Sequence, residues 1–245
     1  MQLIDLGRRG YQEALEIQKE CLEKRIAGEI PDTLILVEHT PIYTAGRAQT
    51  KEGSAPASVV VPEVGPVPVV AVERGGKMTY HGPGQLVGYP VFALTHRDIR
   101  QFLRDIERIL IATVGKVGLS ARPCPETLEL EAGQLDTGVW VGDFKIGSIG
   151  IAVRQWVSFH GFALNVAPEL KYFQAIEPCG FDGHIISSIA RERELNESAA
   201  LDLMPLIKGE LVSKFTDLSA RYEQLAKSTA ESSAGAGADF AMGLA

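Results

Sequence analysis

The sequence has few cysteines and no pattern that would hold a metal or a disulfide framework. Its three cysteines, Cys21, Cys124 and Cys179, lie far apart, and none belongs to a C-x-x-C pair. An odd number of widely spaced cysteines does not build a disulfide framework, and structural zinc sites usually take closely spaced pairs. We therefore expect reduced thiols and no bound metal.

Long hydrophobic segments and targeting signals are also missing. The longest apolar runs, such as VPVVAV at 67–72, end well before the ~18 residues that a membrane span needs. The N-terminal segment carries acidic side chains and has neither a long apolar stretch nor a small-residue cleavage site. These absences predict a soluble protein of the bacterial cytoplasm that does not contact a membrane.

Basic residues are outnumbered by acidic ones. The chain has 24 Lys and Arg against 31 Asp and Glu, which gives a formal net charge of −7. Binding to nucleic acid depends on clustered basic side chains that neutralise phosphates, so this balance argues against it. The phosphate-loop pattern G-x-x-x-x-G-K-[ST] is absent as well. Partners should be small molecules or proteins, and no cofactor is expected.

The apolar residues that are present follow helical and strand periods. A chain of 245 residues, 45% of them hydrophobic, can close one sizeable core. Helices are predicted at Tyr11–Ala27, at Arg97–Val117 with an inward face from Ile99 to Leu110, and at 201–218. Strands are predicted at 3–7, at 33–40, on both sides of a Gly-rich loop within 69–94, and as an antiparallel pair within 138–166.

These elements predict an α+β domain built on a mixed, largely antiparallel sheet flanked by helices. Residues 41–68 mix Gly, Pro, Ser and Thr, so part of them should form a long loop that closes over something. We expect a single domain in residues 1–227. The remaining residues, 228–245, are rich in small side chains and should form a flexible tail.

The Gly-rich loop RGGKMTYHGPGQ at 74–85 is the most unusual local pattern. Glycine lets a backbone come close to a ligand and adopt positive φ angles. Taken alone, the loop fits either a ligand site or an ordinary tight turn.

With its flanking residues, RGGKMTYHGPGQLVGYPV at 74–91 resembles the signature of the lipoyl(octanoyl) transferase family. Three further blocks follow the family's order: EHTPIYTAGR at 38–47, GVWVGDFKIGSIGIAVRQWVSFHGFALNV at 138–166, and IEPCG at 176–180. Two departures, Gly147 in place of a frequent Ala and IISS at 185–188, concern the shape of the acyl pocket. The resemblance implies the fold of the biotin and lipoate protein ligases.

Among the cysteines, the residues alone favour Cys179 as a nucleophile. Cys21 lies in a predicted amphipathic helix, where a buried inert thiol is usual, and Cys124 lies between two prolines in a constrained loop. Pro178 and Gly180 would place Cys179 at the tip of a tight turn. By the resemblance, Cys179 matches the family's acyl-accepting cysteine.

Lys145 is the best candidate to activate that thiol. Phe144 and Ile146 flank it, so it is either a partly desolvated base or a solvated turn lysine. The resemblance implies the first, as part of a Cys-Lys dyad. His81 and His160 leave a competing Cys-His scheme open, since histidine is the commonest general base near neutral pH. We expect His81 to position the substrate.

The resemblance also implies the residues of the acyl-substrate site. They are Arg74, Gly75, Gly76, Lys77, Met78, Thr79, Tyr80, His81, Ser148, Ile149, Gly150, Gly161, Phe162 and Ala163. Backbone N–H groups of these Gly-containing turns would stabilise a tetrahedral oxyanion.

The activity that the resemblance implies is transfer of an octanoyl group in two steps. Cys179 takes the group from octanoyl-acyl carrier protein, and a lysine of a lipoyl-domain protein then accepts it, on an E2 subunit of a 2-oxoacid dehydrogenase or on the glycine-cleavage H protein. No ATP or metal is needed for this exchange, and two successive protein partners imply ping-pong kinetics. An ATP-dependent lipoate ligase, a cysteine hydrolase using Cys179 and His81, and a non-catalytic lipoyl-binding or carrier-binding module remain as alternatives.

Four arginines form a basic stripe on the second predicted helix, where an acidic carrier protein could dock. Arg97, Arg100, Arg104 and Arg108 recur at steps of three and four residues. The stripe either binds the acidic carrier protein or is a solvated face that pairs with Asp98, Asp105 and Glu107.

Overall fold

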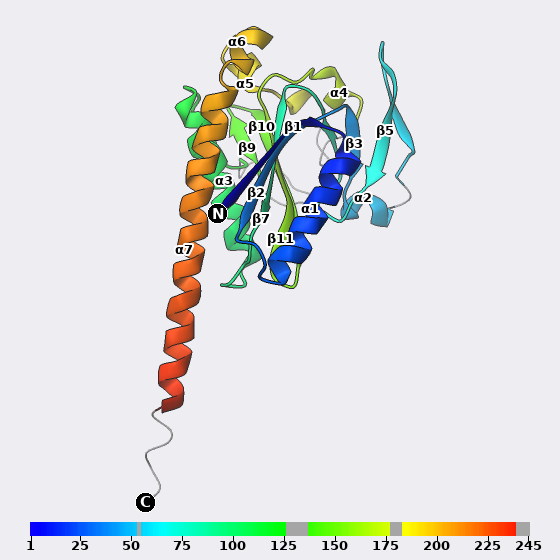
Figure 1. The fold of residues 1–245 in the computed structure, drawn as a ribbon. Helices are drawn as coiled ribbons and strands as arrows, with labels where there is room; N and C mark the ends of the chain where they lie inside the picture. Colours follow the sequence, from blue (N-terminus) through cyan, green and yellow to red (C-terminus); the bar gives the residue numbers. More distant parts are fainter. Residues whose placement is uncertain (53–54, 126–136, 177–182, 239–245) are drawn as a thin grey trace, which may run out of the picture.

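The computed structural model describes residues 1–52, 55–125, 137–176 and 183–238, with side chains up to residue 228 except those of Lys51 and Glu52. In the described residues, the strands form two sheets (Figure 1). The larger has the order β1-β2-β7-β11-β10-β9-β8, with bounds Gln2–Arg9, Thr33–His39, Gln85–Val91, Val157–Asn165, Phe144–Arg154, Val139–Val141 and Ala121–Arg122. The smaller has the order β4-β5-β3-β6, with bounds Ser58–Val61, Gly65–Ala71, Ile42–Ala45 and Met78–His81.

Two of the strand pairs are parallel, β1 with β2 and β3 with β5, and the other ladders that the structure describes are antiparallel. The helices are α1 Tyr11–Ile26, α2 Arg47–Glu52, α3 Ile99–Lys116, α4 Lys171–Gln174, α5 Ile189–Glu192, α6 Glu197–Leu201 and α7 Met204–Ala238, with a 3-10 turn η2 at Gly183–Ile185. The prediction of an α+β fold on a mixed, largely antiparallel sheet is confirmed.

The larger sheet is covered on both faces, which explains its continuous apolar strands. Every residue of β2 except Glu38 is buried. One apolar cluster joins the sheet to α3 and α7, and a second joins it to α1. A strand buried on both faces loses the polar alternation of a half-exposed strand, so it reads as an apolar run.

The local sequence determines where helix α3 begins and which of its faces is buried. Its N-cap Asp98 accepts a hydrogen bond from the backbone N–H of Gln101, which starts the helix two residues later than predicted. Phe102, Ile106 and Leu110 are fully buried at helical spacing. Ile99, expected on the inward face, is the first residue of the helix and is 39% exposed.

Residues 41–68 hold strands where a long loop was expected. They contribute β3, β4 and the beginning of β5 to the smaller sheet, and they also contain α2. The first part of β5 was not predicted, because it contains Pro66 and Pro68 and proline has no backbone N–H to donate to a neighbouring strand. In the structure both prolines face only β4, and pairing with β3 starts at Val69.

Helix α7 is longer than predicted. It runs from Met204 to Ala238 and extends past the rest of the domain in Figure 1. Residues 228–238, expected to belong to a flexible tail, are helical, whereas 239–245 lie outside the described residues. The division of the chain at residue 228 stays a prediction.

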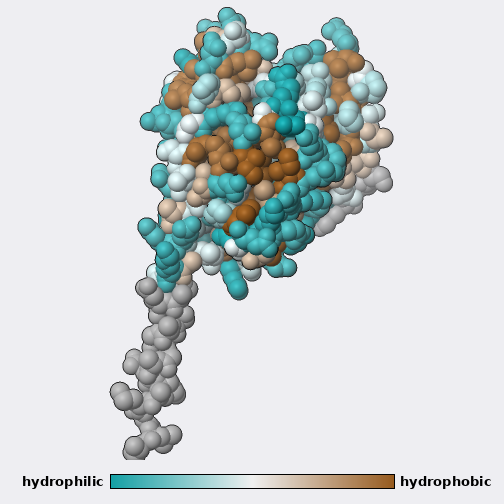
Figure 2. All heavy atoms as spheres, viewed as in Figure 1, coloured by the Kyte–Doolittle hydropathy of each residue, from teal (hydrophilic) through white to brown (hydrophobic). Residues whose placement is uncertain are grey.

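Edge strand β1 and α7 lie on the face shown in Figure 2, where hydrophobic residues gather near the centre of the body. Leu3 of β1 and Leu206 of α7 are 44% and 47% exposed. None of the helices in the described part of the chain combines the length and the apolar character that crossing a membrane requires.

Candidate functional site

A cavity lies where the Gly-rich loop passes over the larger sheet. Strands β7, β10 and β11 contribute one side of its lining, and the loop before β6, β6 itself and the start of α1 contribute the rest. Its lining residues are Tyr11, Arg74, Gly75, Gly76, Thr79, His81, Val87, Tyr89, Ser148, Ile149, Gly150, His160, Gly161, Phe162 and Ala163. The β10–β11 register places Ser148 opposite Ala163 and Gly150 opposite Gly161, so two distant segments meet in one wall.

Eleven of the fourteen residues expected at the substrate site line this cavity. Lys77, Met78 and Tyr80 do not. On β6, Met78 and Tyr80 point to the face opposite Thr79 and His81, because successive side chains of a strand alternate. Tyr80 stacks on Tyr172 with ring centroids 4.4 Å apart, within a separate apolar cluster that also holds Met78. Whether the lining residues bind substrate stays a prediction.

Four lining residues were not in the expected set. Val87 and Tyr89 lie one residue on either side of Gly88, so strand alternation after the Gly-rich loop could have identified them. Tyr11 comes from the first turn of α1, far away in sequence, and burial raises its pKa to about 12. His160 was considered only as a competing base.

Arg74 is buried and holds the loop in place. Its Nη1 donates to the carbonyl oxygens of Gly75 and Lys77, both at 2.9 Å. Its Nη2 donates to the carbonyl oxygen and the hydroxyl of Thr44 on β3, both at 2.8 Å. Gly76 has φ +83°, a conformation that side chains disfavour, and this turn brings both carbonyls toward the guanidinium. The guanidinium therefore ties the loop to the smaller sheet.

Burial disfavours the charged form of both histidines at the cavity. Burial, together with smaller contributions from His39 and Arg74 nearby, lowers the pKa of His81 to about 3. Burial also lowers the pKa of His160 to about 4, although Glu73, 3.5 Å away, opposes this. His160 has φ +56°, a strained value for a residue other than glycine. Its backbone N–H donates to Oε1 of Gln18 at 2.9 Å, which helps to hold that conformation.

Both ring nitrogens of His81 are occupied. Nδ1 lies 2.8 Å from Oε1 of Gln85, and Nε2 lies 3.3 Å from the hydroxyl of Thr44. A general base needs a free nitrogen within reach of the proton it accepts. This geometry disfavours a Cys-His scheme through His81.

Lys145 lies on β10 three residues before Ser148, and it is 5% exposed. Its Nζ lies 5.9 Å from the ring centroid of Trp140. A Cβ on Gly138 would come within 2.7 Å of its Cε and 3.2 Å of its Nζ, so only glycine leaves room for this side chain. Gly138 is itself anchored, because its N–H donates to Oε1 of the buried Glu107 at 2.9 Å.

Cys179 lies outside the described residues, so its distance from Lys145 stays a prediction. The chain that follows it is described: the N–H of Ser187 donates to the carbonyl oxygen of Lys145 at 2.9 Å. Cys21 is buried in α1, and burial raises the pKa of its thiol. Cys124 is half-buried, with its Sγ 3.9 Å from the carbonyl oxygen of Pro125.

The basic stripe on α3 contacts buried acids. Arg104 donates to Glu107 at 2.8 Å, and Arg108 donates to Asp105 at 2.7 Å. Arg221 of α7 reaches the second oxygen of Asp105 at 2.6 Å. Two of the four stripe arginines thus compensate buried carboxylates, and docking of a carrier protein on the stripe stays a prediction.

Known proteins resemble this chain in sequence over most of its length. The family model of the lipoyl protein ligase A/B catalytic domain matches residues 10–202. An octanoyltransferase of Rubrobacter xylanophilus is 40% identical over 86% of this chain and 90% of its own length. An octanoyltransferase of Citrifermentans bemidjiense is 41% identical over 83% of this chain and 95% of its own length.

Among solved structures, lipoate-protein ligase A bound with ATP superposes with a TM-score of 0.63 at 16% identity, over 93% of this chain and 92% of that one. A bi-partite lipoate protein ligase from Thermoplasma acidophilum superposes with a TM-score of 0.57 at 15% identity, over 93% and 90%. At this level of identity the likeness concerns the fold, which is the one that the sequence resemblance implied.

Proposed function

The chain belongs to the lipoyl protein ligase A/B catalytic family and, within it, to the octanoyltransferases, and from this premise we propose its reaction. It transfers an octanoyl group from octanoyl-acyl carrier protein to the ε-amine of a lysine on a lipoyl-domain protein. The acceptors are E2 subunits of 2-oxoacid dehydrogenases and the glycine-cleavage H protein. The observation that carries the proposal is the buried Lys145, which lies on the strand that continues into the cavity wall and contacts the chain beyond residues 177–182.

In the first half-reaction, the thiol of Cys179 transfers its proton to the amine of Lys145. The resulting thiolate attacks the thioester carbonyl, the bond to the carrier sulfur breaks, and an octanoyl thioester forms on Cys179. The proton on Lys145 leaves with the carrier thiol. In the second half-reaction, the acceptor amine attacks this thioester, loses a proton to Lys145 and forms an amide, while Cys179 regains its proton. Neither half-reaction needs ATP, because the first exchanges one thioester for another of similar energy and the second converts a thioester into a more stable amide.

The cavity supplies an apolar wall for the acyl chain. Val87, Ile149, Phe162 and Ala163 all line it, and each is buried. Burying methylene groups contributes about 0.8 kcal/mol each, so a medium-length chain gains several kcal/mol here. We place the carbonyl end of the acyl group toward Lys145 and the methyl end toward Gly150 and Gly161.

His81 has a supporting part in this scheme. Its two nitrogens are occupied, and its lowered pKa keeps it neutral, so it shapes the cavity and leaves the proton transfers to Lys145. We assign the activity to residues 1–227, because the cavity and the buried side chains of α7 up to Tyr222 lie within them. Both partner proteins are expected in the cytoplasm.

Intact-protein mass spectrometry with octanoyl-acyl carrier protein, in the absence of ATP, tests the proposal. Wild type should gain one octanoyl adduct and pass it to an added lipoyl domain. Cys179→Ser should gain none, Lys145→Ala should react much more slowly, and the control Cys124→Ser should behave as wild type. An adduct that persists on Cys179→Ser would overturn the assignment of the nucleophile.

The acceptor step separates the alternatives. Release of free octanoate without acylation of the lipoyl domain would identify a hydrolase. Acylation only when ATP and free octanoate are added would identify a ligase. Binding of the carrier protein with no adduct and no turnover would identify a non-catalytic module.

A further inference from the structure

A row of buried hydrogen bonds begins at the loop over the cavity. Arg74 donates from Nη2 to the hydroxyl of Thr44 at 2.8 Å, and that hydroxyl lies 3.3 Å from Nε2 of His81. On the other side of the ring, Nδ1 of His81 lies 2.8 Å from Oε1 of Gln85. These contacts lead from the loop, across the smaller sheet, to the first residue of β7.

The row continues through two carboxamides toward Lys145. Gln85 donates from Nε2 to Oδ1 of Asn165 at 2.9 Å, and Asn165 donates from Nδ2 to the carbonyl oxygen of Ser187 at 2.9 Å. The N–H of Ser187 then donates to the carbonyl oxygen of Lys145 at 2.9 Å. Gln85 and Asn165 are 1% and 5% exposed, and Ser187 is fully buried.

Two backbone carbonyls determine the direction of every bond in this row. Nε2 of Gln85 also donates to the carbonyl oxygen of Tyr80 at 3.2 Å, and a carbonyl can only accept. The oxygen of Gln85 must therefore face His81, so the proton of the neutral ring is on Nδ1. Nε2 of His81 is then an acceptor, which leaves the hydroxyl of Thr44 to donate to it. In the same way the carbonyl of Ser187 requires the nitrogen of Asn165.

All donors in the row thus point the same way, from Arg74 toward Lys145. A reversed amide at either carboxamide would bring two oxygens together in a buried place, where an unpaired polar group costs about 1–3 kcal/mol. Neither Gln85 nor Asn165 lines the cavity, so neither contacts a substrate that occupies it. Their contacts join the cavity loop to the backbone of Lys145.

We propose that Gln85 and Asn165 are positioning residues for acyl transfer. Their ordered carboxamides hold the cavity loop and the backbone of Lys145 in a fixed position relative to each other. The inference rests on the proposed function and deepens it. The acyl substrate would be bound by the loop at one end of the row, and Lys145 would accept the protons of the reaction at the other end, so breaking a link should slow the chemical step more than it weakens binding.

Asn165→Asp tests the last side-chain link. A carboxylate at this position keeps the size of the side chain but faces the Ser187 carbonyl with an oxygen. We expect kcat to fall about tenfold or more, as for the loss of one buried hydrogen bond, with KM for the octanoyl carrier protein within about threefold of wild type. Asn196→Asp is the matched control, because Asn196 caps α6 through a side-chain oxygen that aspartate also has, and it should leave kcat unchanged.

Gln85→Glu tests the hydrogen bond from Gln85 to Asn165, and it tests the proposal by itself if Asn165→Asp does not fold. Its second oxygen would face Oδ1 of Asn165, and we again expect a loss of about tenfold in kcat with little change in KM. The control is Gln155→Glu in the exposed β10–β11 turn. A merely structural role would lower the unfolding midpoint and leave kcat of the folded enzyme at the wild-type value, and that result in both variants would overturn the proposal.

The 15N chemical shifts of His81 in the wild-type enzyme give a test that requires no variant. The donor order requires the proton on Nδ1, and a proton on Nε2 would overturn the proposal. His39, Tyr11, Arg74 and His160 surround this ring, so the spectra are assigned by comparison with His81→Gln. If wild type transfers no octanoyl group, the proposed function has failed; if it transfers normally and both variants match it, only this inference has failed.

Discussion

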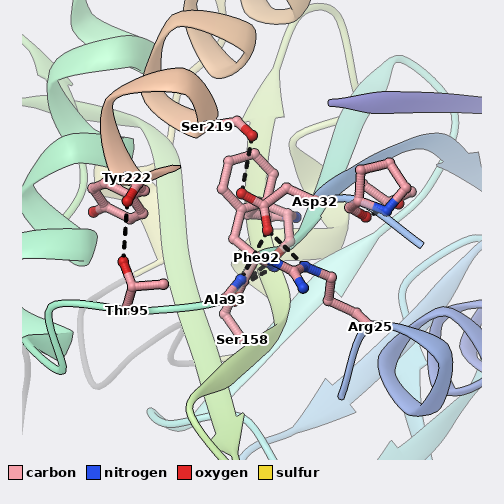
Figure 3. A network of polar contacts seen from close by, with 11 residues as sticks. Arg25, Asp32, Phe92, Ala93, Thr95, Ser158, Ser219 and Tyr222 are labelled. Atoms are coloured by element: carbon pink, nitrogen blue, oxygen red, sulfur yellow. Dashed lines mark hydrogen bonds and ion pairs between the residues drawn. The ribbon is translucent and has the colours of Figure 1, made fainter. Parts of the chain in front are cut away.

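Two buried polar networks in this protein are built in opposite ways. In the first, three groups converge on one carboxylate (Figure 3): Asp32 accepts from Nε of Arg25 and the N–H of Ala93 through Oδ1, and from the hydroxyl of Ser219 through Oδ2, each at 2.9 Å. The second is the row from Arg74 to Lys145, in which each group is linked to the next by one hydrogen bond. The first joins α1, the end of β7 and α7, and the second joins the cavity loop to β10.

The difference indicates what each network does. Several donors on one buried charge make a junction that tolerates a small movement of any one partner, and they hold separate elements of the fold together. A row in which each group is linked to the next by one contact transmits position, since displacing one member displaces the next. We therefore expect the Asp32 network to determine stability and the row to determine the rate of the reaction.

The largest predicted effect is a loss of folding stability at acidic pH. The second network and its surroundings hold His39, His81 and His160, whose pKa values burial lowers to about 4, about 3 and about 4. The unfolded chain binds these protons from about pH 6.5 downward, whereas the folded chain resists them, so stability is full above that pH and falls below it. At pH 5 the loss should be about 2 kcal/mol for each histidine.

Urea unfolding at pH 7, 6 and 5 would measure this loss, and hydrogen exchange at pH 5 should show β3 and β6 opening before α7. His39→Gln, which removes one of the three protonation sites, should reduce the pH-dependent part by about a third. A free energy of unfolding that stays flat from pH 7 to pH 5 would show that these rings are not held neutral.

Removing Asp32 should separate stability from catalysis. Asp32→Ala leaves Arg25, the N–H of Ala93 and Ser219 without their acceptor, and loss of one partner from a buried ion pair costs about 3–5 kcal/mol. Denaturant unfolding should show this loss, while kcat below the unfolding temperature stays at the wild-type value. Asp217→Ala, at an exposed position of α7, is the control and should change neither. A large drop in kcat of folded Asp32→Ala would contradict the division between the networks.

Gly138→Ala should lower activity as well as stability, because Gly138 has φ +151°, a backbone conformation that side chains disfavour. The added Cβ would lie 2.7 Å from Cε of Lys145, so the amine must move. A displacement of about 1 Å at a reacting group can cost on the order of 100-fold, and we expect kcat to fall by that amount with KM nearly unchanged. Gly115→Ala in α3, where a Cβ would meet nothing within 4 Å, should keep full activity. Equal activity of the two variants would show that Lys145 is not positioned by this contact.

The smallest effect is expected from Ser219→Ala. It removes one of three donors to Asp32 and leaves the other two, so the free energy of unfolding should fall by about 1 kcal/mol. A thermal melt would measure this, and kcat should be unchanged. A loss as large as that of Asp32→Ala would mean that the three contacts do not act independently.

Strong local patterns made much of the larger sheet predictable. Buried β2 and the amphipathic α3 follow apolar periods that burial on both faces of the sheet imposes, and Asp98 marks the start of α3 within two residues. Of the smaller sheet, only the second part of β5 was predicted, because Pro66 and Pro68 read as loop residues, and only the pairing partners show that this stretch of β5 contacts β4 alone. The length of α7 was missed as well, since its small residues carry little periodic signal.

By itself, the sequence determined the fold class, the family and most of the residues that line the cavity, because these depend on periodicity and on motifs of neighbouring residues. Only the tertiary structure decided which histidine nitrogens are occupied, that Gly138 makes room for Lys145, and that Gln85 links His81 of the smaller sheet to Asn165 of the larger one. Those facts depend on how strands and loops meet in space, as where Gln85 contacts Asn165, 80 positions away, and Asn165 contacts Ser187, 22 positions away, and no local pattern encodes such contacts.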